Sequence, residues 1–135
     1  MCEAVLRQLL IEDVVIADRC GTRIYPHRAP EGTDRPYAVY HRVSATDEPT
    51  QASGGTLISA LVQFDWIADS FEKARELGVR AKYVLNAWHG MRNGLSIQRV
   101  FWRNGFDDVD LQIVGSEKRI PRHVQEYEVF YDEVT

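Results

Sequence analysis

The chain has 135 residues, enough for one domain with one hydrophobic core and too few for two. Its composition is 44% hydrophobic and 27% charged, and no apolar run approaches the roughly 20 residues of a bilayer span, which argues against a membrane-spanning helix. The formal net charge of -4 argues against a protein that binds nucleic acid mainly through its phosphates, because that mode of binding needs a basic surface.

The first ten residues lack the basic start and pure apolar stretch of a secretory signal, so we expect synthesis in the cytoplasm. The chain has two cysteines, Cys2 and Cys20, without a CxxC motif or a Cys/His cluster. Two thiols are too few to stabilise a small secreted fold. We therefore predict two free thiols.

Apolar residues at helical spacing predict a short helix near the N-terminus, over Val5 to Leu10. The β-branched run Val14 to Ile16 follows and favours extended backbone. Arg23 to Pro26 is typical of a brief strand that the proline ends, and 27–36 is typical of a loop.

Two strands with a period of two are predicted next, over Tyr37 to Ser44 and Leu57 to Ile67. They suggest a hairpin. The segment between them, 44–56, contains no large apolar side chain and is far longer than a tight hairpin turn. We expect a long flexible loop at 44–56, ordered only against a neighbouring molecule.

The clearest element is an amphipathic helix that begins after a possible N-cap at Ser70. Its apolar stripe recurs every three to four residues from Phe71 to Trp88, and Gly90 is expected to end it. Asn93-Gly94 then predicts a turn.

Two further strands are predicted over Leu95 to Trp102 and Val124 to Tyr131. The segment 103–121 cannot be assigned by period, and we treat it as irregular with a possible strand over Val109 to Val114. Runs of strands predict an α+β fold: an antiparallel sheet of about four strands, with an N-terminal helix and one long amphipathic helix packed on one face. Residues 1–135 form a single domain in this prediction.

The histidines do not indicate a metal site, because they are widely separated and lack zinc-binding spacing. They are His27, His41, His89 and His123. The acidic residues Asp107, Asp108 and Asp110 lack the glycine and glutamate that complete an EF-hand loop. We interpret them as a solvated turn.

Phosphate-binding and nucleophile motifs are also absent from the sequence. Gly54-Gly55 lies in neither a P-loop nor a GxGxxG pattern, and we interpret it as a loop tip. Cys20 has Arg19 and Arg23 nearby in sequence but no positioned base, so it is predicted to be structural. No catalytic, cofactor-binding or metal-binding residue is predicted, and no enzyme activity is expected.

Two observations leave alternatives open. Arginine supplies 13 of the 16 basic residues, which suits protein interfaces or reflects the codon usage of the source genome. Tyr40, His41 and Trp66 could line a pocket, so a small-ligand-binding α+β domain remains an alternative. A ligand screen without hits would argue against it.

Several blocks of the sequence resemble the tail-completion, or tail-terminator-like, proteins of tailed bacteriophages and prophages. The blocks are Arg23 to Pro26, Pro36 to Ser44, Leu61 to Ala68, Asn86 to Gly90 and His123 to Tyr131. The similarity extends from about Val5 to Tyr131 and consists of packing residues rather than a catalytic signature. The acidic segment Asp107 to Gly115 matches least.

This resemblance implies a structural virion protein that self-associates into a ring, typically a hexamer, at the head-proximal end of the tail. Its partners would be the tail-tube protein and a head-connector protein, with assembly in the host cytoplasm. The negative charge suggests that DNA passes through the lumen without specific binding. A head-side connector of similar size remains an alternative, which neighbouring genes would resolve.

Overall fold

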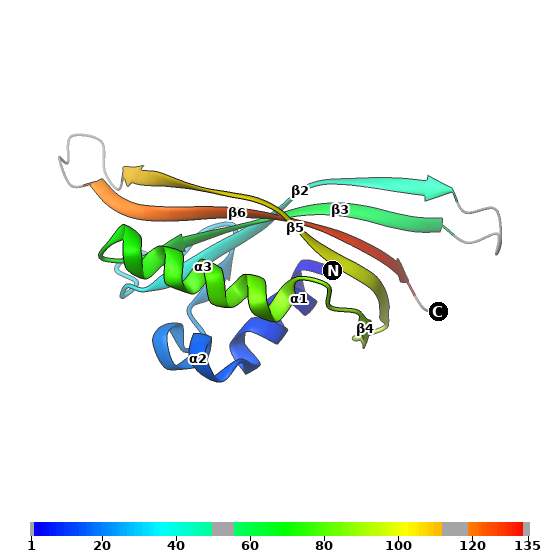
Figure 1. The fold of residues 1–135 in the computed structure, drawn as a ribbon, viewed down its shortest axis with the longest axis horizontal. Coiled ribbons are helices and arrows are strands. Elements are labelled where there is room, and N and C mark those ends of the chain that lie inside the picture. Colours follow the sequence, from blue (N-terminus) through cyan, green and yellow to red (C-terminus); the bar gives the residue numbers. More distant parts are fainter. Residues whose placement is uncertain (1, 50–55, 112–118, 134–135) are drawn as a thin grey trace.

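The computed structural model describes residues 2–49, 56–111 and 119–133, which form three helices and six strands (Figure 1). In chain order these elements are α1 (Cys2–Glu12), α2 (Val14–Cys20), β1 (Ile24–Pro26), β2 (Tyr37–Pro49), β3 (Thr56–Ile67), α3 (Phe71–Leu85), β4 (Gly90–Arg92), β5 (Leu95–Leu111) and β6 (Arg119–Glu133). No helix in these ranges is long and apolar enough to cross a bilayer.

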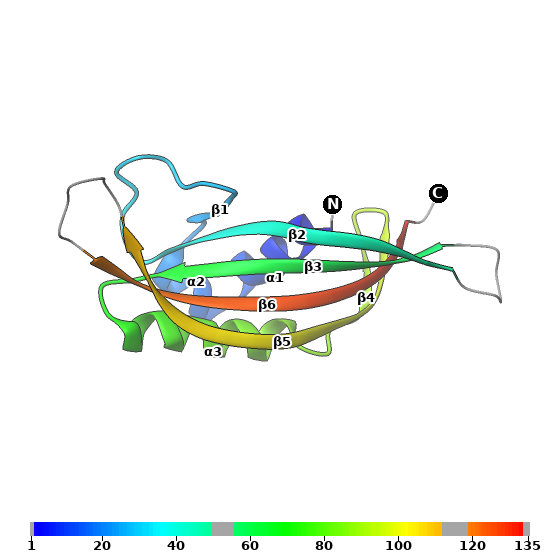
Figure 2. The same cartoon turned by 90° about the horizontal axis from the view of Figure 1, so that it is seen from above.

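One twisted sheet contains all six strands in the order β1-β2-β3-β6-β5-β4. The four long strands lie side by side in its centre, and the two short ones flank them (Figure 2). β1 pairs with β2 in parallel, and every other pairing is antiparallel. β2 ends and β3 begins at one end of the sheet, whereas β5 ends and β6 begins at the opposite end (Figure 1).

All three helices lie on one face of the sheet, and the core fills the space between the two layers (Figure 1). An aromatic cluster occupies the centre of this core. Phe64 stacks on Tyr40 and on Trp66, and Tyr127 meets its edge at a centroid distance of 6.0 Å. Such pairs stabilise a fold by about 0.5–1.5 kcal/mol each beyond their burial.

The predicted fold class is wrong in the size and type of the sheet and in its helices. The sheet has six strands rather than four, and the parallel β1 makes it mixed. Three helices of 7 to 15 residues replace one N-terminal and one long helix. β1 is the brief strand predicted at Arg23 to Pro26, although it is not counted among the four predicted strands of the sheet. β4 has three residues, too few to show a period in the sequence.

The β-branched run Val14 to Ile16 is helical, not extended. Asp13 caps α2 by accepting a hydrogen bond from the backbone N–H of Ile16 at 3.1 Å, and this local bond outweighs the weak preference of branched side chains. α3 begins after the predicted cap Ser70, but it ends at Leu85, before the predicted limit.

The first part of the predicted loop 44–56 belongs to β2. The strand continues to Pro49, and Ser44 to Pro49 pair with Thr56 to Leu61 of β3. Period alone missed this extension because polar residues occupy both faces of the strand here. The remainder, 50–55, lies outside the described residues, as does the predicted Gly54-Gly55 tip.

The segment 103–121, which we predicted to be irregular, belongs largely to two strands. β5 runs to Leu111 and β6 begins at Arg119. Register shifts between Ile97 and Arg99, and between Trp102 and Asn104, show two bulges that change which residues face the helices. A strict alternation therefore assigns the wrong face between the two bulges, and the second bulge restores the original phase. Residues 112–118, including the end of the possible strand Val109 to Val114, are not described.

Candidate assembly surfaces

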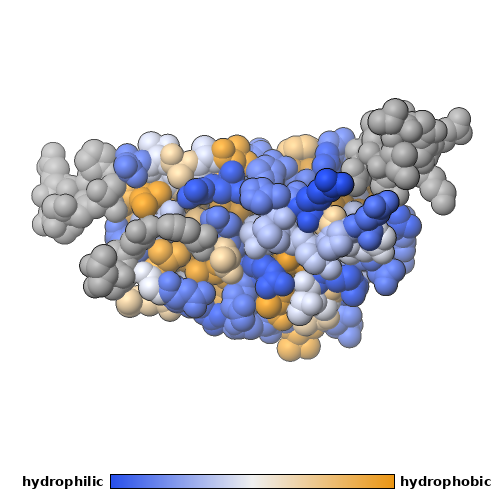
Figure 3. Space-filling view, turned by 180° about the vertical axis from the view of Figure 1, so that it is seen from behind, coloured by the Kyte–Doolittle hydropathy of each residue, from blue (hydrophilic) through white to orange (hydrophobic). Residues whose placement is uncertain are grey.

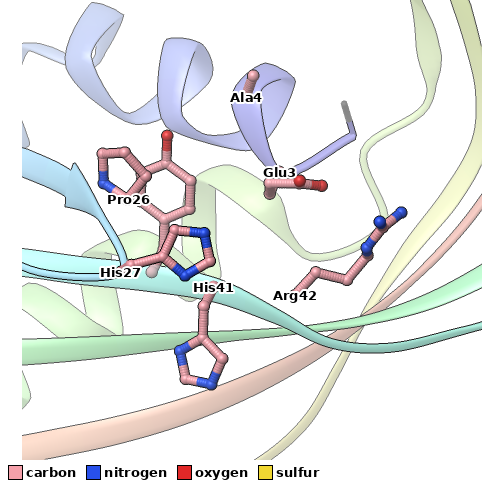
Figure 4. Close-up of a pocket in the computed structure, with 7 residues that line it drawn as sticks. Glu3, Ala4, Pro26, His27, His41 and Arg42 are labelled. Atoms are coloured by element: carbon pink, nitrogen blue, oxygen red, sulfur yellow. The ribbon is translucent and has the colours of Figure 1, made fainter.

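An open hollow of about 350 Å³ lies between the start of α1 and the first half of β2 (Figure 4). It is lined by Glu3, Ala4, Pro26, His27, Tyr40, His41 and Arg42. Figure 4 shows the carboxylate of Glu3 beside the helix and the imidazole of His41 pointing away from the helix, on the other side of the strand. Among the described residues, no three His, Cys, Asp or Glu side chains are grouped to hold a metal ion. The hollow is thus a shallow, mixed-charge surface feature.

The pocket that we considered for a small ligand is not formed by its three predicted residues. Trp66 is fully buried on the helix-covered face and donates its indole N–H to Gln125 at 3.2 Å. His41 is opposite Gln63 on the other face of the sheet. Tyr40 and His41 do line the hollow together, but Trp66 does not.

His123 is held in an ionic cluster where α3 meets β5 and β6. Its Nδ1 lies 2.9 Å from an Asp107 oxygen, and the other Asp107 oxygen accepts hydrogen bonds from Arg75 of α3. These bonds from Arg75 and His123 lower the pKa of Asp107. The cluster fastens α3 to the far end of the sheet.

The acidic residues of β5 are engaged in ion pairs rather than forming a free turn. Asp107 pairs with Arg75 and His123, and Asp108 pairs with Arg122 at 2.7 Å. Both carboxylates lie on a strand, on opposite faces, because alternate residues of a strand point to opposite sides. The side chain of Asp110 is outside the described part of the chain.

Gln125 is a buried polar residue with no counterpart in our sequence prediction. Its amide N–H donates to the Gly78 carbonyl of α3 at 2.8 Å, and its oxygen accepts from Trp66 and from the Tyr127 hydroxyl. All these groups are therefore satisfied within a core that excludes water. The arrangement is structural, and alternation along β6 is its only sequence signal.

The two cysteines are free and buried, as the sequence predicted. Burial raises the pKa of the Cys2 thiol to about 12 and that of Cys20 to about 11. A thiol is a nucleophile only as thiolate, so both are unreactive in the folded protein.

The face of the sheet that the helices leave open carries an aromatic and basic cluster. Phe101 packs edge-on against Phe130. The guanidinium groups of Arg99 and Arg103 lie 5.3 and 5.2 Å from the centre of the Phe101 ring. Arg103 also pairs with Glu128. Arginine and aromatic side chains are enriched where proteins contact one another.

Figure 3 shows the molecule from the side opposite to the view of Figure 1, where hydrophobic residues form small patches among hydrophilic ones. Seven large hydrophobic side chains are exposed in the described part of the chain: Val14, Val15, Val43, Val79, Tyr83, Met91 and Phe106. Two of them, Val43 on β2 and Phe106 on β5, lie on the outer two of the four long strands.

At each lateral edge of the sheet, one long strand extends beyond the short strand beside it, and no described segment pairs with the extension. On one side, β1 and the bond from His27 N–H cover β2 only as far as Tyr40. On the other side, β4 and the residues before it cover β5 only as far as Trp102, whose N–H donates to Asn86. Within the described ranges, the outer edges of 41–49 in β2 and 103–111 in β5 have no strand paired with them. We call them the β2 edge and the β5 edge.

Comparison with known proteins adds two findings. A family model described as "Tail completion protein gp17" matches residues 4–131, nearly the whole chain. A chain of the structure "Virion of native gene transfer agent (GTA) particle" has the same fold, with a TM-score of 0.68 and 14% identity, over 94% of this chain and 91% of that one. No curated protein matches the sequence.

Proposed function

Because this chain belongs to the tail completion protein gp17 family and is thus a structural protein of a phage tail, we propose that it forms a ring at the head-proximal end of the tail. The ring ends polymerisation of the tail tube and provides the surface that joins the tail to the filled head. The family match over residues 4–131 carries this proposal.

The surface features support an assembly role rather than catalysis. Long open strand edges bind other chains readily, and in a protein that remains alone they are a liability. The buried polar side chain Gln125 and the buried thiols are directed into the core, where they stabilise the fold. We therefore propose a subunit that binds neighbours and has no enzyme activity.

The charge supports a passage for DNA rather than a clamp. Each copy carries a net charge of -4, so a ring of six copies repels the phosphate backbone overall. We propose that DNA crosses the lumen without specific binding, with the tail-tube protein on one side of the ring and a head-connector protein on the other.

Deletion of the gene in its phage tests the function. The proposal requires full heads to accumulate beside unattached tails of uncontrolled length in electron micrographs, and a plasmid copy of the gene must restore joined particles. Free tails of normal length would instead indicate a head-side connector. Normal joined particles from the deletion would refute both roles.

A further inference from the structure

We propose that the β2 edge of one copy pairs with the β5 edge of the next copy, so that a continuous antiparallel sheet crosses each subunit boundary. This inference rests on the proposed ring and names the surface that builds it. The partner is a second copy of this chain, and the contact is made mainly by backbone hydrogen bonds.

The two edges are matched in length and position. They span 41–49 and 103–111, and they lie on opposite sides and at opposite ends of the sheet (Figure 2). A second copy placed beside the first, and shifted along the strands, brings one edge against the other. Such a shift between neighbours is compatible with closure when the strands tilt from the ring axis, as in a β-barrel.

The direction of the strands favours antiparallel pairing. β2, β3, β6 and β5 are successive antiparallel neighbours, so β2 and β5 run in opposite directions. A copy that is rotated about an axis along the strands keeps these directions, and its β2 is antiparallel to the β5 that it meets. The contact is head-to-tail and can repeat around a ring.

The order of charges along the edges agrees with this direction. The β2 edge begins with His41 and Arg42 and ends near Asp47, whereas the β5 edge begins with Arg103 and becomes acidic at Asp107. In an antiparallel pair, the basic start of the β2 edge is opposite the acidic part of the β5 edge, and Arg103 lies toward the acidic end of the β2 edge. Parallel pairing would place like charges together, which is destabilising.

One register also matches the two faces of the sheets. Cross-strand partners share a face, and the pairs from Arg42 through Val62 to Tyr127 place Arg42 on the helix-covered side, where Asp107 also lies with its partner His123. Setting Arg42 opposite Asp107 places His41 opposite Asp108 on the open face.

The same register brings together two of the exposed apolar side chains. Val43 is the bulged residue of β2, between Arg42 and Ser44, and Phe106 precedes Asp107 on β5. Each is 48% exposed in the single copy, and pairing of Arg42 with Asp107 brings the two positions close together across the boundary. Burying apolar side chains at this boundary adds to the stabilisation from the backbone hydrogen bonds.

Two-fold pairing is the competing arrangement. Pairing of two β5 edges would bring the acidic residues Asp107 and Asp108 of both copies together, which is unfavourable. Pairing of two β2 edges would place Arg42 of one copy near the acidic end of β2 in the other copy, but it would leave both β5 edges unpaired. Only the head-to-tail arrangement covers both edges.

Disulfide cross-linking distinguishes these arrangements. The variants Val43→Cys and Phe106→Cys are mixed and oxidised mildly at high protein concentration, and covalent dimers are measured on a non-reducing gel. We expect dimers in the mixture and only background in either variant alone. The double variant should form a ladder of covalent oligomers. The buried native thiols do not compete, because their raised pKa values keep them protonated.

The controls use an exposed position away from both edges. Val79→Cys, 70% exposed on α3, should not cross-link to either edge variant. Adding Arg42→Glu to the Val43→Cys chain should lower the yield of mixed dimer about fivefold, because it opposes two acidic groups. Equal melting temperatures establish that the variants fold.

The results that overturn the proposal are specific. Dimers in Val43→Cys or Phe106→Cys alone, at the level of the mixture, would establish two-fold pairing. A mixture with no dimer above the Val79→Cys background would exclude this surface. These results separate the proposed surface from the proposed function. If only the surface is wrong, the cross-link is absent but the gene deletion still yields unjoined heads and tails. If the function is wrong, the deletion yields normal particles, whatever the cross-link shows.

Discussion

Replacing Gly78 with alanine tests how α3 is seated on the sheet. Gly78 is buried in the middle of α3, and a Cβ atom there would lie 2.5 Å from Cδ2 of His123 and 3.1 Å from the amide nitrogen of Gln125. Real Cβ contacts are not this short, so the imidazole, the amide or the helix must move.

Movement of the imidazole is restricted on its other sides. Its Nδ1 is bonded to Asp107, and the position that a Cβ on Gly105 would take is only 3.2 Å from its Nε2. Movement of the helix would instead stretch the bond between Gln125 and the Gly78 carbonyl. Neither route is free of cost.

The magnitude follows from two opposing effects. In a helix interior, alanine is more favourable than glycine by about 0.8–1.0 kcal/mol. Overpacking a close contact costs about 1–3 kcal/mol. Because the His123 ring is held in place, we expect the cost of overpacking to exceed the gain in helix propensity. The free energy of unfolding should fall by about 1–2 kcal/mol and Tm by about 5 °C for a domain of this size.

Urea denaturation followed by tryptophan fluorescence measures the free energy of unfolding. The matched control is Val79→Ala, the next residue, which is 70% exposed and should change stability by less than about 0.5 kcal/mol. In a His123→Ala background the obstacle is gone, and Gly78→Ala should become neutral or stabilising. A Gly78→Ala protein that is as stable as the parent, or more so, would refute the close seating of α3.

Three further predictions concern stability and reactivity. Gln125→Ala should destabilise the fold by about 3 kcal/mol in the same assay, since it leaves a cavity and unpaired buried donors, and a loss below about 1 kcal/mol would contradict the network. Asp13 has a pKa lowered by its bonds to Arg80, so it stabilises the fold above pH 4 and that contribution is lost as the pH falls. Asp13→Asn should therefore weaken the dependence of Tm on pH below 4, and an unchanged profile would exclude this ion pair as its source. Cys2 and Cys20 should be inert to a thiol reagent at pH 8 until the protein unfolds in urea, and rapid reaction in native buffer would show that they are not buried.

Free edges are expected of the predicted sheet, but the register of the strands explains why the sequence does not locate them. β5 is continuous through Arg103 and Asp107, but two bulges change its phase and its acidic residues resemble a loop. The polar continuation of β2 to Pro49 likewise has no core-facing pattern. Both segments are strands because their partners, β6 and β3, continue beside them.

The sequence by itself determined the local elements with a strong period or a strong signal. The apolar stripe of α3, its cap at Ser70, the buried faces of β3 and β6, and the resemblance to the tail completion family all follow from residue order. Local patterns suffice here because each of these elements buries one face and leaves the other in water.

Only the tertiary structure decided which short or polar segments become strands and which residues meet across the core. β4 forms because the long neighbouring strand β5 offers it hydrogen bonds, and Gln125 is acceptable in the core because α3 presents the carbonyl of Gly78 to it. The two open edges depend on how far each neighbour extends. These features arise from pairing between distant segments, whose free energy does not depend on the local pattern of either one.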